Sequence, residues 1–143
     1  MVALNTGRNT KMRLGDIRND LVAASVKIFG GSIIMRNAAG YLTKGAVATG
    51  CFGVGRAEET VDNSAGVAGA LGVNYRIGCF AFANSAAGDL IAQADIGKVC
   101  YIVGDQTVAK TNGSATRSPA GIVEGIEGTA VWVRFDEALT RAS

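Results

Sequence analysis

Residues 71–83 read Leu-Gly-Val-Asn-Tyr-Arg-Ile-Gly-Cys-Phe-Ala-Phe-Ala and form the longest strand pattern in the chain. From Leu71 to Cys79 every second residue is apolar, and Gly, Asn, Arg and Gly stand between them. Strict alternation of this kind predicts a half-buried β-strand with one face toward a core and one toward water. After Cys79 the apolar set shifts to the two phenylalanines, which predicts a β-bulge near Gly78.

Short apolar runs continue on both sides of this stretch. We expect further strands over residues 21–29, 32–36, 41–43, 49–59, 90–92, 98–103, 106–111, 119–124 and 129–135. Turn residues separate these runs at 30–31, 37–40, 104–105, 112–113 and 125–128, and a loop is expected over 59–69. Short strands at spacings of roughly 8–12 residues are typical of a barrel or sandwich. The sequence therefore predicts an all-β chain with a compact small β-barrel or β-sandwich body.

The composition agrees with this fold class. The chain has 143 residues, which suits one domain, and it contains 20 Gly and a single Pro. Frequent glycines between apolar runs indicate many tight turns. Charged residues make up 18% of the chain, against roughly 25% in typical soluble domains. A surface with so little charge suits being covered by partners.

The first 20 residues differ from the rest. They hold four basic and two acidic side chains, an excess of +2, whereas residues 21–143 hold ten of each. The basic excess of the whole chain, +2, therefore lies in this segment. We expect an extended N-terminal arm over 1–20 and a β-rich body over 21–143. Partner contact is expected from one basic and three apolar residues of the arm: Arg8, Met12, Leu14 and Ile17.

The sequence offers no set of residues for a known catalytic chemistry. It contains no histidine, which excludes Ser-His-Asp and Cys-His catalysis and most zinc sites. Glu58, Glu59 and Asp62 form the densest group of carboxylates, and we interpret them as part of a solvated loop. No second acidic cluster pairs with them, as glycoside hydrolysis would need. We expect neither an enzyme nor a cofactor or metal site.

Three cysteines, Cys51, Cys79 and Cys100, lie in apolar stretches. Their odd number and the lack of a Cys-x-x-Cys motif argue against a disulfide framework and favour small buried side chains in a reducing compartment. The opening residues lack a basic region followed by an apolar run, so we expect no secretory signal. No uninterrupted apolar stretch reaches the roughly 18 residues of a membrane span.

Trp132 is the best candidate for an aromatic anchor. In the strand expected over 129–135 it faces opposite Val131 and Val133, and it therefore lies on the outer face. Aromatic residues of this kind are enriched in the centres of protein interfaces. Direct binding of nucleic acid is not expected, because the basic footprint of such proteins is larger.

Several motifs, in their order, resemble one family. They are residues 3–10, 53–59 with 61–63, 80–85, 100–109, 120–124 and 131–133. In these motifs the chain resembles the decoration, or head cement, proteins of tailed bacteriophages. The resemblance covers most of the chain.

The resemblance implies a structural virion protein without catalytic residues. It would fold in the host cytoplasm and assemble as a homotrimer. It would then bind the major capsid protein on the outer surface of the capsid and stabilise the expanded head. Multivalent docking of a symmetric oligomer raises avidity without strong single contacts.

Two other functions stay open at this point. The first is a structural subunit of the phage tail or of the head–tail connector. The second is a β-barrel binding module for nucleic acid or a sugar, and salt-dependent DNA binding would support its nucleic-acid form.

Overall fold

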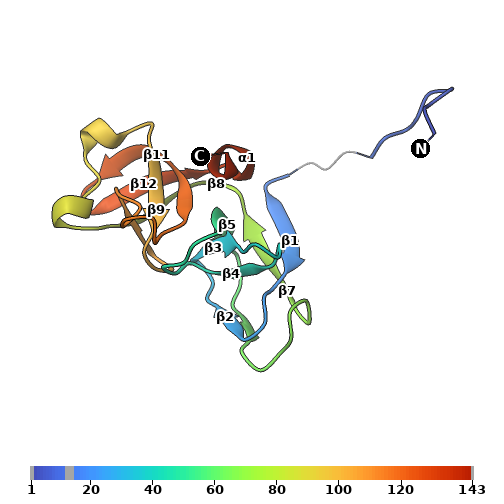
Figure 1. The fold of residues 1–143 in the computed structure, drawn as a ribbon, viewed down its shortest axis with the longest axis horizontal. Coiled ribbons are helices and arrows are strands. Elements are labelled where there is room, and N and C mark those ends of the chain that lie inside the picture. The colour runs from blue at the N-terminus through green and yellow to red at the C-terminus, as the bar shows by residue number, and fades with distance from the viewer. Residues whose placement is uncertain (1, 12–14, 143) are drawn as a thin grey trace.

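A computed structural model describes residues 2–11 and 15–142, and it is mainly β (Figure 1). The strands of this part of the chain are β1 (Ile17–Leu21), β2 (Val26–Ile28), β3 (Ile33–Arg36), β4 (Leu42–Lys44), β5 (Phe52–Ala57), β6 (Val61–Asn63), β7 (Gly72–Arg76), β8 (Gly78–Asn84), β9 (Val99–Ile102), β10 (Thr107–Ala109), β11 (Pro119–Glu127) and β12 (Ala130–Phe135). Two 3-10 turns and one short helix complete them: η1 (Ala87–Asp89), η2 (Gln93–Asp95) and α1 (Glu137–Arg141). The predicted fold class is confirmed.

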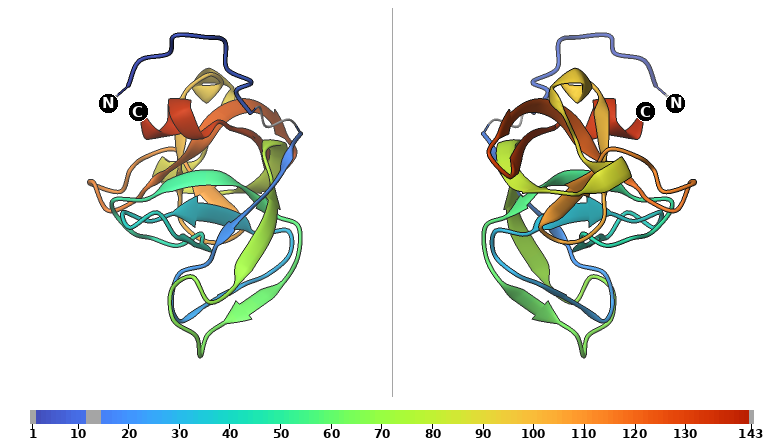
Figure 2. Two further views of the ribbon diagram at one scale, coloured as in Figure 1. Left: turned by 90° about the vertical axis from the view of Figure 1, so that its right-hand side faces the viewer. Right: turned by 90° about the vertical axis from the view of Figure 1, so that its left-hand side faces the viewer.

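The strands form a closed barrel and an open sheet that lie side by side (Figures 1 and 2). The barrel has the order β10-β8-β12-β11-β9, and its strands pair antiparallel except for β8 with β10. The five-stranded sheet has the order β1-β7-β5-β3-β4. A two-stranded ribbon, β2 with β6, lies at the end of the sheet away from the barrel (Figure 1).

The stretch 71–83 connects the two halves. It is two strands and not one, because β7 ends at Arg76 in the open sheet and β8 begins at Gly78 in the barrel. Gly78 has φ of 145°, a conformation that only glycine adopts without strain. The predicted irregularity near Gly78 is therefore present, but it moves the chain from one sheet to the other.

β3 lies between the two cores of the protein. Ile33 and Met35 pack into the barrel core with Ile102, Val131 and other buried side chains. Ile34, which points the opposite way, is buried in the second core. Both faces of β3 are thus covered by side chains. This explains why the apolar residues of β3 are continuous, whereas a strand with one face in water has alternating apolar and polar residues.

The open sheet also touches the barrel through a glycine. A Cβ atom added to Gly53 of β5 would lie 2.2 Å from the carbonyl oxygen of Ala120 on β11. No real side chain tolerates that distance, so the two backbones approach each other only because residue 53 is glycine.

Several sequence predictions are confirmed at the level of single elements. The hairpin of β9 and β10 is antiparallel, and the turn at 37–40 has Gly40 with φ of 91°. In β12, Val131, Val133 and Phe135 are buried, while Trp132 and Arg134 are exposed, as alternation requires.

Four expected elements are wrong in detail. The turn expected over 125–128 is mostly strand, because β11 continues to Glu127. The strand over 21–29 is broken by a turn at Ser25, which has φ of 59°. The loop over 59–69 contains the short strand β6. Residues 90–92 are not a strand, because the Asn84 side chain binds both the N–H and the C=O of Ile91 (3.0 and 2.9 Å) where a neighbouring strand would have to pair.

The predicted boundary between arm and body falls inside a strand. β1 begins at Ile17 and pairs with β7 over its whole length. The part of the predicted arm that stands outside the sheets is therefore shorter than 20 residues. Short strands with alternating exposure are hard to recognise when, as here, residues 18–20 are all polar.

Candidate functional site

The N-terminal arm, defined here as residues 2–11, is exposed at every position. Val2 and Leu4 are 95% and 72% exposed, and Arg8 is also exposed. Figure 1 shows this segment projecting away from the body. Of the predicted contact residues, Met12 and Leu14 lie outside the described residues.

Ile17 lies at the start of β1, the edge strand of the open sheet. Its side chain is 53% exposed. It stands on the outer face of the sheet beside Arg76 of β7, its cross-strand partner. A partner can therefore contact Ile17 through its exposed side chain and through the backbone of the edge strand.

Trp132 lies on the outer wall of the barrel and is 37% exposed. Its Nε1–H donates to the Glu127 carboxylate at 2.9 Å, which fixes the orientation of the indole ring. Its cross-strand neighbours are Ala81 of β8 and Gly125 of β11. Because these neighbours have almost no side chain, they leave the indole ring partly uncovered, and its bond to Glu127 preorganises it for contact.

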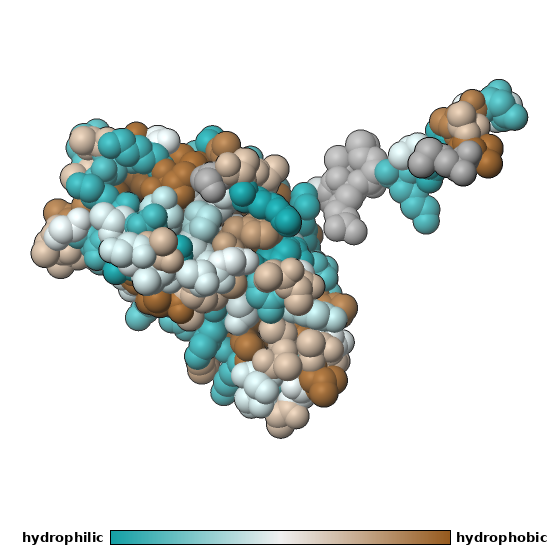
Figure 3. Space-filling model, viewed as in Figure 1, coloured by the Kyte–Doolittle hydropathy of each residue, from teal (hydrophilic) through white to brown (hydrophobic). Residues whose placement is uncertain are grey.

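Ile17 and Trp132 therefore belong to two separate surfaces. Ile17 lies in the open sheet and Trp132 in the barrel. The space-filling view shows polar and apolar side chains mixed over the face toward the viewer, with the arm standing off the body (Figure 3). A partner that contacted the arm and the barrel wall together would have to span a large part of the molecule.

The carboxylates that the sequence singled out do not converge on a site. Glu58 forms ion pairs with Arg56 (2.6 Å) and Arg76 (3.3 Å), and the hydrogen bond from Arg56 lowers its pKa. Glu59 accepts a bond from Asn74 and Asp62 from Ser64. Each carboxylate thus has its own local partner.

A network that no sequence pattern indicated joins α1 to the open sheet. Arg36 binds Asp20 at 2.7 Å and lies 3.6 Å from Glu137, the first residue of α1. Tyr75 donates its hydroxyl to Glu137 at 3.2 Å. Burial, and next the charge of Glu137, raises the pKa of Tyr75 to about 12. The phenol is therefore a structural hydrogen-bond donor at neutral pH.

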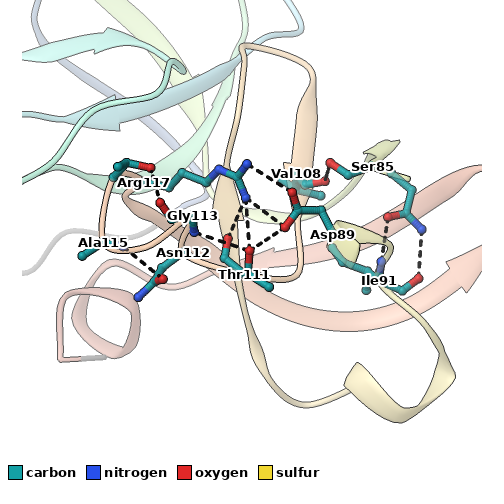
Figure 4. A network of polar contacts seen from close by, with 11 residues as sticks. Ser85, Asp89, Ile91, Val108, Thr111, Asn112, Gly113, Ala115 and Arg117 are labelled. Atoms are coloured by element: carbon teal, nitrogen blue, oxygen red, sulfur yellow. Dashed lines mark hydrogen bonds and ion pairs between the residues drawn. The ribbon is translucent and has the colours of Figure 1, made fainter. Parts of the chain in front are cut away.

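A second network fixes the loop between β10 and β11 (Figure 4). Arg117 binds both oxygens of Asp89 (3.0 and 3.2 Å) and the carbonyl of Thr111 (3.0 Å). Arg117 is also the main reason why the pKa of Asp89 is lowered. Residues 113–115 all have φ near +60°, a left-handed turn that costs energy at Ser114 and Ala115. The surrounding bonds hold this strained loop in place.

The cysteines have weakly acidic thiols. Burial, followed by Glu124, raises the pKa of Cys79 to about 11, and burial raises that of Cys100 to about 12. Burial also raises the pKa of Cys51, which borders an open hollow of about 350 Å³ together with Phe52 and Arg141. Few of these thiols are ionised at neutral pH, so they are poor nucleophiles.

Within residues 2–11 and 15–142, no group of three or more His, Cys, Asp and Glu side chains is arranged to hold a metal ion. No helix in the described part of the chain is long and apolar enough to cross a membrane.

Comparison with known proteins gives no relative. No family model, no curated protein and no solved structure matches this chain.

Proposed function

We propose that this chain is a structural head protein that binds the outer surface of a bacteriophage capsid and stabilises the expanded head. The observation that carries the proposal is the exposed N-terminal arm on a folded β body. The rest of the chain covers little of Val2 and Leu4, which are 95% and 72% exposed. A segment that exposes apolar side chains in this way is suited to order on a partner surface.

Trp132 supplies a second contact in this proposal. The ring is held by Glu127 and flanked by Ala81 and Gly125, so it requires little ordering when it binds. An arm and a rigid anchor on one body allow two weak contacts to act together. The effective concentration of the second contact then raises the avidity.

The partner we propose is the major capsid protein, and self-association as a homotrimer follows only from the resemblance. The body has equal numbers of basic and acidic side chains beyond residue 20, which suits a broad contact without strong charge steering. The basic excess of the arm would face an acidic or polar strip of the shell.

Co-sedimentation with expanded capsid shells that lack this protein tests the proposal. We expect saturable binding on the outside of the shells, in multiples of three copies per lattice site. Absence of binding to shells, with assembly into rings or tubes, would favour a tail or connector subunit. Binding to DNA that weakens steeply with salt would instead favour the nucleic-acid form of a binding module.

A further inference from the structure

Among the residues that the structure describes, no strand pairs with the outer edge of β1. β1 has β7 on one side only, as the last strand of the open sheet. The Val22 N–H donates to the Leu71 carbonyl at 2.9 Å, and the Ile77 N–H donates to the Asp16 carbonyl at 3.0 Å. Because bonded pairs alternate along an antiparallel ladder, the even-numbered residues from 16 to 22 direct their backbone groups toward β7.

The odd-numbered residues of β1 consequently direct their backbone N–H and C=O groups away from the sheet. In the part of the chain that the structure describes, the backbone groups of Ile17 and Asn19 find no partner across this edge. The edge closes at Leu21, since its N–H donates to the Asp20 carboxylate (2.8 Å) and the next turn of chain bonds to β4. A free edge from Ile17 to Asn19 remains.

The side chains beside this edge carry opposite charges that form no ion pair with another described residue. They are Asp16 and Arg18, which flank Ile17. The Nε atom of Arg18 is buried and has no hydrogen-bond partner among the described residues. The charges that this segment offers to a partner are therefore the carboxylate of Asp16 and the guanidinium of Arg18.

We propose that the edge of β1 binds the same edge of a second copy, antiparallel about a two-fold axis at Ile17. In this register the backbone groups of the two Ile17 residues bond to each other, and their exposed side chains meet. Asp16 of each copy then lies opposite Arg18 of the other copy. The order acid, isoleucine, base is self-complementary under a two-fold rotation, as an isologous contact requires.

The other registers are less favourable. An axis at Arg18 would place two guanidinium groups opposite each other, and like charges directly across a strand pair are destabilising. An axis at Asn19 would pair Arg18 with Asp20, but it needs the backbone of Leu21, where the edge is already closed. Asp20 is also committed to Arg36 at 2.7 Å. The axis at Ile17 is the one that uses the free edge and both free charges.

This contact does not depend on the proposed function, because it concerns copies of the chain in solution. If the chain does decorate a shell, the same contact would link neighbouring copies across two-fold positions. The occupant is a second copy and not another protein, because the charge order around Ile17 complements itself.

Sedimentation velocity over a range of concentrations tests the contact with charge reversals. We expect the wild-type chain to dimerise, and Arg18→Asp or Asp16→Arg alone to weaken the dimer at least tenfold. An equimolar mixture of the two variants should form a heterodimer, because all four charges then pair with opposites. The double variant D16R/R18D should dimerise like the wild type.

Two further variants complete the experiment. Ile17→Lys places two cations at the axis and should give a folded monomer, which circular dichroism verifies. Lys110→Asp reverses an exposed charge far along the chain from β1 and should leave the dimer unchanged. A wild-type chain that stays monomeric at all concentrations, or an oligomer that Arg18→Asp does not weaken, would overturn the inference.

Discussion

Trp132 on β12 lies directly opposite Ala81 on β8, and the only side-chain atom of Ala81 is a methyl carbon. On the other side of the tryptophan stands Gly125, whose added Cβ would lie 4.0 Å from the indole ring. The barrel wall thus presents one large aromatic ring between two small residues. Such rings dominate the binding energy of many protein interfaces.

Trp132→Ala should therefore weaken binding to capsid shells without unfolding the chain. We expect a loss of about 2 kcal/mol or more in binding, roughly 30-fold in affinity, because a preorganised aromatic contact is removed. The free energy of unfolding should fall by no more than about 1 kcal/mol. Phe29→Ala, which removes an aromatic ring that is 52% exposed, is the matched control. Equal effects of both variants on shell binding would contradict the role of Trp132.

Two deletions of different length distinguish the role of the N-terminal arm from that of β1. Removal of residues 2–11 should leave the unfolding transition of the body unchanged, because these residues are exposed throughout, and should abolish or greatly weaken shell binding. Removal of residues 2–20 should also destabilise the fold by roughly 2 kcal/mol or more, because the β1–β7 ladder and the ion pair of Asp20 with Arg36 are lost. Shell binding that survives the shorter deletion would contradict the role of the arm.

Gly53→Ala should destabilise the protein at the contact between the open sheet and the barrel. The new Cβ would lie 2.2 Å from the Ala120 carbonyl oxygen, so the two backbones must separate. We expect a loss of about 1–3 kcal/mol in chemical denaturation. Gly104→Ala has open space around its new methyl group and serves as the control. Equal stability of the two variants would show that the close approach of β5 and β11 is not needed.

Stability should fall in alkaline solution. In the unfolded chain Tyr75 loses its proton near pH 10, whereas in the folded protein its pKa is about 12. Between these values the folded state binds more protons than the unfolded state, so the free energy of unfolding decreases as the pH rises. The raised pKa values of Cys79 and Cys100 act in the same direction from about pH 9.

Urea denaturation at a series of pH values checks this dependence. The loss from Tyr75 should reach roughly 2–3 kcal/mol by pH 12, since one pKa unit corresponds to about 1.4 kcal/mol. Tyr75→Phe is less stable at neutral pH because the bond to Glu137 is lost, but its curve should decline less between pH 10 and 12. Parallel curves for the two proteins would contradict the environment described for Tyr75.

Local patterns in the sequence predicted the elements whose neighbours lie close along the chain. Alternation over 129–135 located β12 and put Trp132 on its outer face. Alternation also located β7, and the shift of the apolar set after Cys79 indicated an irregularity near Gly78. The period alone cannot show that the chain leaves one sheet for another at that residue. Exposure of Ile17 follows from its place on an edge strand, which depends on the long-range pairing of β1 with β7.

Long-range polar contacts had no signal in the sequence. Arg36, Tyr75 and Glu137 come from three distant parts of the chain, and only the fold brings them together. The sequence pattern places Asn63 in the loop expected over 59–69, because polar side chains of this kind suit turns. In the structure it donates to the carbonyls of Ala23 and Val67 (2.9 and 3.0 Å) and so belongs to the interior.

Thermal disruption of expanded capsid shells tests the central claim most directly. A protein that binds the intact shell but not its separated subunits must raise the temperature of disruption by mass action. We predict that saturating amounts of the chain raise this temperature, that the chain without residues 2–11 has little effect, and that Phe29→Ala acts like the wild type. An unchanged disruption temperature at saturating concentrations of the intact chain would contradict a cement function.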